Sequence, residues 1–136
     1  MITRGNPMWR LLCVSQFYAL LFVYTYLGLT PHPEQSVPVF NDLLMHFAGY
    51  SVAAVSISFA RPYWPIWQRI LFLLVYSIAI EIAQHFHPPR TFSLMDILAN
   101  AGGILLGLAL VILLQITCKP FNRLLYWQTR PNTHAS

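Results

Sequence analysis

Hydrophobic positions in this chain gather into four long runs, separated by short proline-rich or charged segments. Each run is close to the roughly 20 residues that an α-helix needs to cross a bilayer core about 30 Å thick. The runs are Trp9–Leu29, Asp42–Ala60, Ile66–Phe86 and Leu94–Ile116. The segments between them read TPHPEQSVP, RPYWP and HPPRT. The pattern predicts an all-α membrane protein, a single domain over residues 1–136 that forms an antiparallel bundle of four transmembrane helices.

The composition supports a membrane protein and argues against a soluble one. Hydrophobic residues make up 57% of the chain and charged residues only 9%, whereas soluble domains carry about 25% charged residues. The formal net charge of +4 could suggest a nucleic-acid partner, but the basic residues are dispersed and no nucleic-acid motif accompanies them. We therefore expect no nucleic-acid partner and look for another explanation of the basic charge.

Basic residues lie in segments that alternating crossings place on one side of the membrane. Seven of the eight Lys and Arg residues occur in the amino-terminal tail, the loop after the second run or the carboxy-terminal tail. All four tryptophans lie near the same ends of the runs, as in an interfacial belt. The positive-inside rule then predicts cytoplasmic termini and outward-facing loops over 30–41 and 87–93. The first run is too long for a signal peptide and is followed by no A-x-A site, so we predict an uncleaved helix.

Polar residues at the outward ends of the runs follow helical spacing, which places them on one face of each predicted helix. These stripes are Asp42, His46, Gly49 and Ala53 in the second run, Ser77, Glu81, Gln84 and His85 in the third, and Asp96, Asn100, Gly103 and Gly107 in the fourth. Small residues let helices approach one another closely in lipid. We therefore predict that Gly49, Gly103 and Gly107 pack the helices together, so that the stripes face one another and their polar ends meet.

Part of this pattern has a purely structural interpretation. Asn41 and Ser93 precede the second and fourth runs, where they can cap the helices, and the helix dipole stabilises acidic groups in the first turn. Glu81 is different, because it lies about 7 Å inside the predicted end of its helix at 1.5 Å per residue, too deep for capping. Arg90 on the following short loop is its obvious charge partner. A structural Glu81–Arg90 clasp and a working site therefore both remain open.

Three segments resemble, in order and spacing, the VanZ-like family of small bacterial membrane proteins. They are DLLMHFAGY from Asp42, EIAQ from Glu81 followed by Arg90 and Phe92, and DILANAGG from Asp96 followed by Gly107. The resemblance implies a multi-pass protein of the bacterial cytoplasmic membrane, in a family named after an accessory protein of glycopeptide resistance and without an established catalytic activity. Leu43 departs from the pattern, because the family often has lysine there, so the outer cluster has one cation fewer.

The polar residues suggest a site that binds or processes an amphiphile of the cell envelope, such as a lipid headgroup or a lipid-linked wall precursor. The catalytic candidates are His46, Glu81 and Asp96, and the binding candidates are Asp42, Gln84, Arg90 and Asn100. The Arg90 guanidinium offers a bidentate donor for phosphate, and the imidazole of His46 is the candidate acid or base. Since no nucleophile motif is present, whether the protein is an enzyme is left undecided.

Two other functions remain open. The polar cluster could instead fix helix packing in a homo-oligomer or in a complex with a partner membrane protein. A small ion-coupled carrier is the third hypothesis, although only Gln16 and Ser56 supply polar groups well inside the cytoplasmic half. We expect no cofactor and no metal, because the candidate ligands form no short metal-binding motif.

Overall fold

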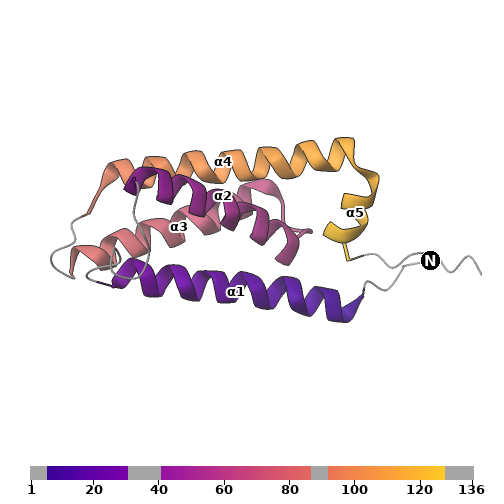
Figure 1. Ribbon diagram of the computed structural model, residues 1–136, viewed down its shortest axis with the longest axis horizontal. Helices are drawn as coiled ribbons and strands as arrows, with labels where there is room; N and C mark the ends of the chain where they lie inside the picture. Colours follow the sequence, from indigo (N-terminus) through magenta and orange to yellow (C-terminus); the bar gives the residue numbers. More distant parts are fainter. Residues whose placement is uncertain (1–5, 31–40, 87–91, 128–136) are drawn as a thin grey trace, which may run out of the picture.

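The computed structural model describes residues 6–30, 41–86 and 92–127. Four of its helices are long and apolar enough to cross a membrane, as predicted, and the described part of the chain contains no strand. The helices are α1 (Pro7–Leu29), α2 (Asp42–Ala60), α3 (Ile66–His85), α4 (Leu94–Thr117) and the short α5 (Lys119–Leu125). Figure 1 shows α1 and α4 on opposite sides of the bundle, with α2 and α3 between them and α5 at one end.

Capping side chains explain where three of the long helices begin. Asn6 accepts hydrogen bonds from the backbone N–H groups of Met8 and Trp9 at 3.0 and 3.3 Å, and Pro7 occupies the first helical position. This cap starts α1 at Pro7 rather than at the predicted Trp9. Asn41 caps α2 and Ser93 caps α4, each through a side-chain oxygen that accepts a backbone N–H. Both of these caps agree with the sequence-based interpretation.

The carboxy-terminal ends of the helices differ slightly from the prediction. The third helix ends at His85, because Phe86 adopts the conformation of a C-cap, and the fourth continues to Thr117. The short helix α5 follows where the sequence indicated only a basic tail. Its carbonyl at Leu124 accepts a 2.8 Å hydrogen bond from the Trp9 indole, which holds α5 beside the start of α1. This tertiary contact has no signal in the local sequence pattern.

The closest helix packing joins α2 and α4. Gly103 lies directly against the backbone of Phe47, and Gly107 lies against the backbone of Ser51 and 2.7 Å from the Cβ of Ala54 as measured from an ideal Cβ position. These are approaches that only a residue without a side chain permits. The α2 face involved differs from the predicted stripe: Gly49 instead faces the Tyr24 ring of α1, and its ideal Cβ lies 3.5 Å from the hydroxyl. The polar ends of α2 and α4 meet nonetheless.

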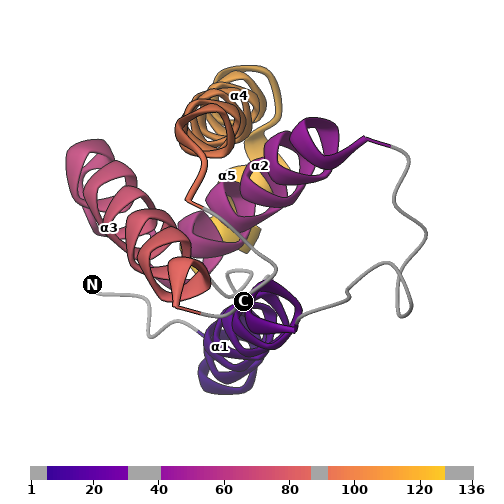
Figure 2. The same ribbon diagram turned by 90° about the vertical axis from the view of Figure 1, so that its left-hand side faces the viewer.

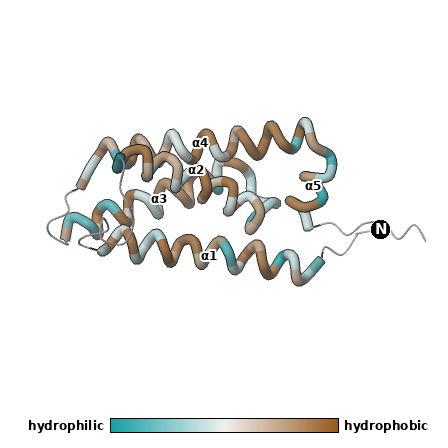
Figure 3. The backbone as a smooth tube through the Cα atoms, viewed as in Figure 1, coloured by the Kyte–Doolittle hydropathy of each residue, from teal (hydrophilic) through white to brown (hydrophobic). Residues whose placement is uncertain are grey.

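The two ends of the bundle carry opposite charge. The acidic end is where α2 and α4 begin and contains all the acidic residues that the structure describes: Asp42, Glu81 and Asp96. The basic end is where α1 and α3 begin and where α5 lies (Figure 1); it contains Arg10, Arg61, Arg69, Lys119 and Arg123. Figure 3 shows hydrophobic residues along the helices between these ends.

Both described ends of the chain lie at the basic end, where the backbone N–H of Asn6 donates to the carbonyl of Trp127 at 2.7 Å. Four antiparallel crossings require this, because an even number of crossings returns the chain to the side on which it started. The structure therefore fits the predicted common side for the termini. That this side is the cytoplasm stays a prediction from the positive-inside rule.

Candidate functional site

The packing of α2 against α4 brings four predicted site residues together at the acidic end. Asp42 and His46 are one turn apart on α2, and Asp96 and Asn100 are one turn apart on α4. Figure 2 views the bundle from this end and shows α2 and α4 as neighbours, with α3 and α1 completing the ring. Because residues four apart share a helix face, each helix presents two polar side chains to the other.

A hydrogen-bonded chain connects three helices through Asn100. The Nδ1 atom of His46 lies 3.1 Å from the Asn100 Oδ1 atom, and the Asn100 amide nitrogen donates to the Ser77 hydroxyl at 2.7 Å. Since a carbonyl oxygen can only accept, Nδ1 of His46 carries the proton in this contact. Asn100 and Ser77 are both fully buried. The imidazole orientation is therefore set by a buried amide whose own position is fixed by α3.

The other ring nitrogen of His46 faces two carboxylates. Its Nε2 atom lies 3.8 Å from a carboxylate oxygen of Asp42 and 3.7 Å from one of Asp96. The Asp96 side chain is only 14% exposed and that of His46 only 17%, whereas the Asp42 side chain is 65% exposed. His46 on α2 and Asp96 on α4 are thus sheltered, whereas Asp42 in the first turn of α2 is open to the surroundings.

Glu81 and Gln84 hold the neighbouring part of α3 to two other helices. A carboxylate oxygen of Glu81 accepts a hydrogen bond from the backbone N–H of Ser93 at 3.2 Å, and Ser93 is the cap of α4. The Gln84 amide donates to the carbonyl of Gly28 on α1 at 2.8 Å. Glu81 is 1% exposed and Gln84 3% exposed. Both side chains therefore point into the bundle, as their predicted stripe requires, whereas His85 from the same stripe is exposed.

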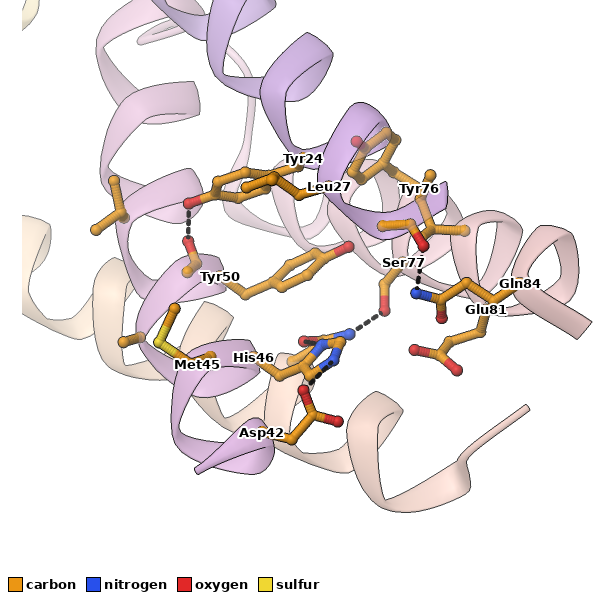
Figure 4. A pocket seen from close by; sticks show the side chains of 16 residues that line it. Tyr24, Leu27, Asp42, Met45, His46, Tyr50, Tyr76, Ser77, Glu81 and Gln84 are labelled. Atoms are coloured by element: carbon orange, nitrogen blue, oxygen red, sulfur yellow. Dashed lines mark hydrogen bonds and ion pairs between the residues drawn. The ribbon is translucent and has the colours of Figure 1, made fainter. Parts of the chain in front are cut away.

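A cavity of about 350 Å³ lies beside this polar cluster, between α1, α2 and α3. Figure 4 shows the polar side chains of Asp42, His46, Ser77, Glu81 and Gln84 along one part of it. The remaining wall is largely apolar or aromatic. It includes Leu27, Met45, Val52 and Ile80, together with Tyr24, Tyr50 and Tyr76. Its size and its mixture of apolar wall and converging polar groups are those of a small-molecule site.

The three tyrosines that line this cavity were missed by the sequence analysis. The Tyr24 hydroxyl donates to the Gly49 carbonyl at 2.8 Å, and the Tyr76 hydroxyl donates to the Leu21 carbonyl at 2.9 Å. Tyr50 lies between them, with its ring centroid 6.2 Å from that of Tyr24. Tyr50 follows His46 by one helical turn and Tyr76 precedes Gln84 by two, which is a spacing signal for those two, whereas the approach of Tyr24 on α1 depends on how the helices pack.

The cavity opens toward the side of the bundle along α2. Three of its α2 lining residues, Met45, Ala48 and Val52, are exposed at the bundle surface, with Met45 43% and Val52 54% exposed. Apolar side chains exposed on a helix long enough to cross a membrane are expected to contact lipid. A molecule with an apolar tail could therefore reach the cavity sideways from the bilayer.

The structure brings together most of the predicted site residues. Asp42, His46, Asp96 and Asn100 form one contacting group, and Glu81 and Gln84 line the same cavity on α3. Arg90 lies outside the described residues. The predicted Glu81–Arg90 clasp and the phosphate-binding role of Arg90 therefore stay predictions.

Comparison with known families agrees with the pattern of these residues. A sequence profile described as VanZ/LLP1 matches residues 10–115, which include α2 and α3 in full, α1 except its first residues, α4 except its last residues, and every described site residue. No curated protein and no solved structure gives a significant match to the chain.

Proposed function

The chain belongs to the VanZ/LLP1 family and is a multi-pass membrane protein, and from this premise we propose that its acidic end binds an amphiphile of the cell envelope. The ligand is a lipid headgroup or a lipid-linked wall precursor, taken from the outer leaflet of the bacterial cytoplasmic membrane. A link to glycopeptide resistance belongs to this proposal, since the family is named for that function. Any processing step would use the groups that converge on the headgroup.

The observation that carries this proposal is the two-part lining of the cavity. Its polar part is formed by side chains from three helices, and its apolar part continues to the exposed side of α2 at Met45 and Val52. A lipid has the same two parts, a polar headgroup and an apolar tail. A soluble ligand would have no use for an opening that faces acyl chains, and a pure packing cluster would leave no cavity of this volume.

The residues have distinct roles under this proposal. The first turns of α2 and α4 point their positive dipole ends toward the acidic end, which offsets part of the repulsion between its carboxylates and an anionic headgroup. His46 is the candidate acid or base of any processing step, because an imidazole nitrogen can accept a proton and donate it again. Glu81 and Asp96 would orient the headgroup or assist His46.

A structural role for the cluster is the second candidate, and specific contacts favour it. Asn100 connects α2 and α3 with α4, and Gln84 ties α3 to α1, so that polar side chains join all four long helices. By contrast, the described contacts give little support to an ion carrier. In the basic half, Ser56 donates to Gln16 at 2.9 Å and Gln16 donates to the Cys13 carbonyl at 3.0 Å, so these groups satisfy one another.

Glu81→Gln separates the two candidates. The amide keeps the size of the side chain and can still accept the hydrogen bond from Ser93, but it loses the carboxylate. We expect a normally abundant protein that fails to complement a deletion strain, scored by sensitivity to envelope stress or to glycopeptides. Arg61→Gln, the same kind of change at the basic end, is the matched control and should complement fully.

Two other results of this experiment would count against a working site. If the Glu81→Gln protein is abundant and complements fully, Glu81 has no part in ligand chemistry. If its abundance falls strongly while Arg61→Gln is normal, Glu81 acts mainly to hold the bundle together, as the structural candidate requires. Immunoblotting of membranes beside the sensitivity assay distinguishes these outcomes.

A further inference from the structure

We propose that Asp42, His46 and Asp96 bind a divalent transition-metal ion at the acidic end. One ligand atom from each residue lies within 4.8 Å of the other two. The three residues come from two helices, α2 and α4, whose close packing at Gly103 and Gly107 sets their separation. This explains why the sequence contains no short metal-binding motif and why we predicted no metal from it.

The distances within this cluster suit an ion better than direct hydrogen bonds. The Nε2 atom of His46 lies 3.8 and 3.7 Å from the two carboxylate oxygens. Hydrogen bonds between nitrogen and oxygen are shorter, about 2.7–3.2 Å. Two ligands that each lie about 2.0–2.2 Å from one zinc ion are separated by about 3.0–3.6 Å. A small adjustment of the side chains would therefore place all three atoms around a common centre.

A residue outside the cluster prepares the histidine for metal binding. Asn100 accepts the Nδ1 proton of His46, so the Nε2 atom of the neutral ring offers its lone pair toward Asp42 and Asp96. Metal-binding histidines are held in this way by a hydrogen bond from the other ring nitrogen to a carbonyl or carboxylate oxygen. Asn100 is itself buried and fixed by Ser77, so this orientation belongs to the fold and does not depend on a ligand.

Charge and ligand type narrow the choice of ion. When all three groups bind as metal ligands, the two carboxylates balance the charge of a divalent cation. One nitrogen and two oxygens are ligands typical of Zn²⁺ or Mn²⁺, and they are unsuited to Cu(I), which prefers thiolates. Both cysteines belong to other parts of the chain: Cys13 lies on α1 and Cys118 between α4 and α5.

The proposed ion would have open coordination positions on the cavity side. Three protein ligands leave at least one position of a tetrahedral ion free, as in catalytic zinc sites. Asp42 and His46 both line the cavity, so that position can receive an oxygen atom of a bound molecule. A phosphate oxygen of the headgroup is the natural ligand there; this last step rests on the proposed function, whereas the metal site itself does not.

The direct test is calorimetry with Zn²⁺ on the full-length protein in detergent, after EDTA treatment and removal of the chelator. We expect about one equivalent of Zn²⁺ to bind, and much weaker binding of Mg²⁺. His46→Gln and Asp96→Asn should each weaken Zn²⁺ binding at least about tenfold, since even second-shell changes at metal sites cost about 10–100-fold. His85→Gln is the matched control, because His85 is an exposed histidine of α3 outside the cavity lining, and it should bind like the parent.

Asp42→Asn keeps the test decisive if a more buried variant fails to fold, because the Asp42 side chain is 65% exposed. It should also bind Zn²⁺ at least about tenfold more weakly. Absence of saturable binding near one equivalent overturns the proposal, and so does an equal loss in His85→Gln and His46→Gln. Lipid binding measured separately on the EDTA-treated protein shows whether the proposed function stands without the metal.

Discussion

Cations at the basic end lie against aromatic rings and backbone carbonyls, whereas polar groups at the acidic end contact one another across helices. Arg61 lies over the Trp64 ring at 5.5 Å and Arg10 over the Trp127 ring at 5.4 Å. A nitrogen of Arg69 donates to the Pro62 carbonyl at 2.7 Å. These contacts anchor the three arginines at the basic end, although the buried Nε atom of Arg69 has no hydrogen-bond partner among the described residues.

The acidic end is organised differently. His46, Asn100 and Ser77 form a chain across three helices, and the carboxylate of Glu81 reaches the cap of α4. A cavity lies beside these groups and opens along α2. Placing polar groups inside a membrane bundle is costly and is typical of functional sites. The comparison is consistent with two of our proposals, that the basic end orients the protein in the membrane by the positive-inside rule and that the acidic end binds its ligand.

The largest expected effect concerns topology: the two ends of the bundle should lie on opposite sides of the membrane. Cys13 and Cys118 are first replaced, and a single cysteine is then introduced at Thr133 or at Thr91. A membrane-impermeant thiol reagent should reach only one of these two positions in intact cells. Position 91 should label in intact cells, because it follows the third crossing, and position 133 should label only after lysis. Labelling of position 133 in intact cells would place the acidic end in the cytoplasm. It would then contradict the proposal that the ligand comes from the outer leaflet.

The next largest effect concerns the packing that assembles the acidic end. In Gly103→Ala the new methyl group would meet the Phe47 backbone, so α2 and α4 must separate; we expect a loss of about 1–3 kcal/mol, as for other overpacked sites. Gly102→Ala is the control, because its methyl group meets only the Phe47 ring at 3.2 Å, and a ring edge can move. Thermal unfolding in detergent compares them. Equal stability of both variants would show that α2 and α4 do not pack as closely as described.

Replacing one hydrogen-bonding amide side chain at each end of the bundle should change stability and ligand binding by unequal amounts. Asn100→Leu loses bonds to two helices at a fully buried position, so we expect a cost of about 1–3 kcal/mol and loss of ligand binding. Gln115→Leu at the basic end loses one bond, from its amide to the Tyr126 hydroxyl at 3.2 Å, and should cost about 0.5–1.5 kcal/mol without affecting ligand binding. Unfolding curves and lipid binding measured on the same samples check both. If Gln115→Leu impairs binding as strongly, the two ends do not differ in function.

Much of the fold follows from the sequence because lipid imposes length and hydropathy on each crossing. The four long helices were predictable for this reason, and the caps Asn41 and Ser93 because their side-chain oxygens can accept the first backbone N–H groups of a helix. The polar spacing also indicated that His46 and Asn100 share one level of the bundle. The rest depends on helix rotation and tertiary contact. Nothing in the runs indicated α5, the approach of Tyr24 to Tyr50 and Tyr76, or the α2 face that Gly103 and Gly107 meet.

The cluster of Asp42, His46 and Asp96, proposed above to bind a metal ion, illustrates the same limit at the site. Spacing placed Asp42 with His46 on one helix face, but their distance to Asp96 depends on how α2 and α4 pack. The separation of the two helices, and with it this distance, is set by the close approaches at Gly103 and Gly107 and not by the local sequence. A spacing pattern can therefore identify the helix faces that meet, whereas the distances between ligand atoms require the assembled bundle.

The central claim, that the cavity at the acidic end holds an envelope amphiphile, is tested most directly by photocrosslinking from its wall. A photoreactive phenylalanine analogue at Met45, which lines the cavity and is 43% exposed, should form an adduct with a lipid in membranes. The same analogue at Val75, which is 57% exposed but does not line the cavity, reports ordinary contact with bilayer lipid. Mass spectrometry should find one phosphate-bearing lipid class enriched at position 45 over position 75, with the enrichment lost in Asn100→Leu. The same lipid mixture at both positions would contradict the account.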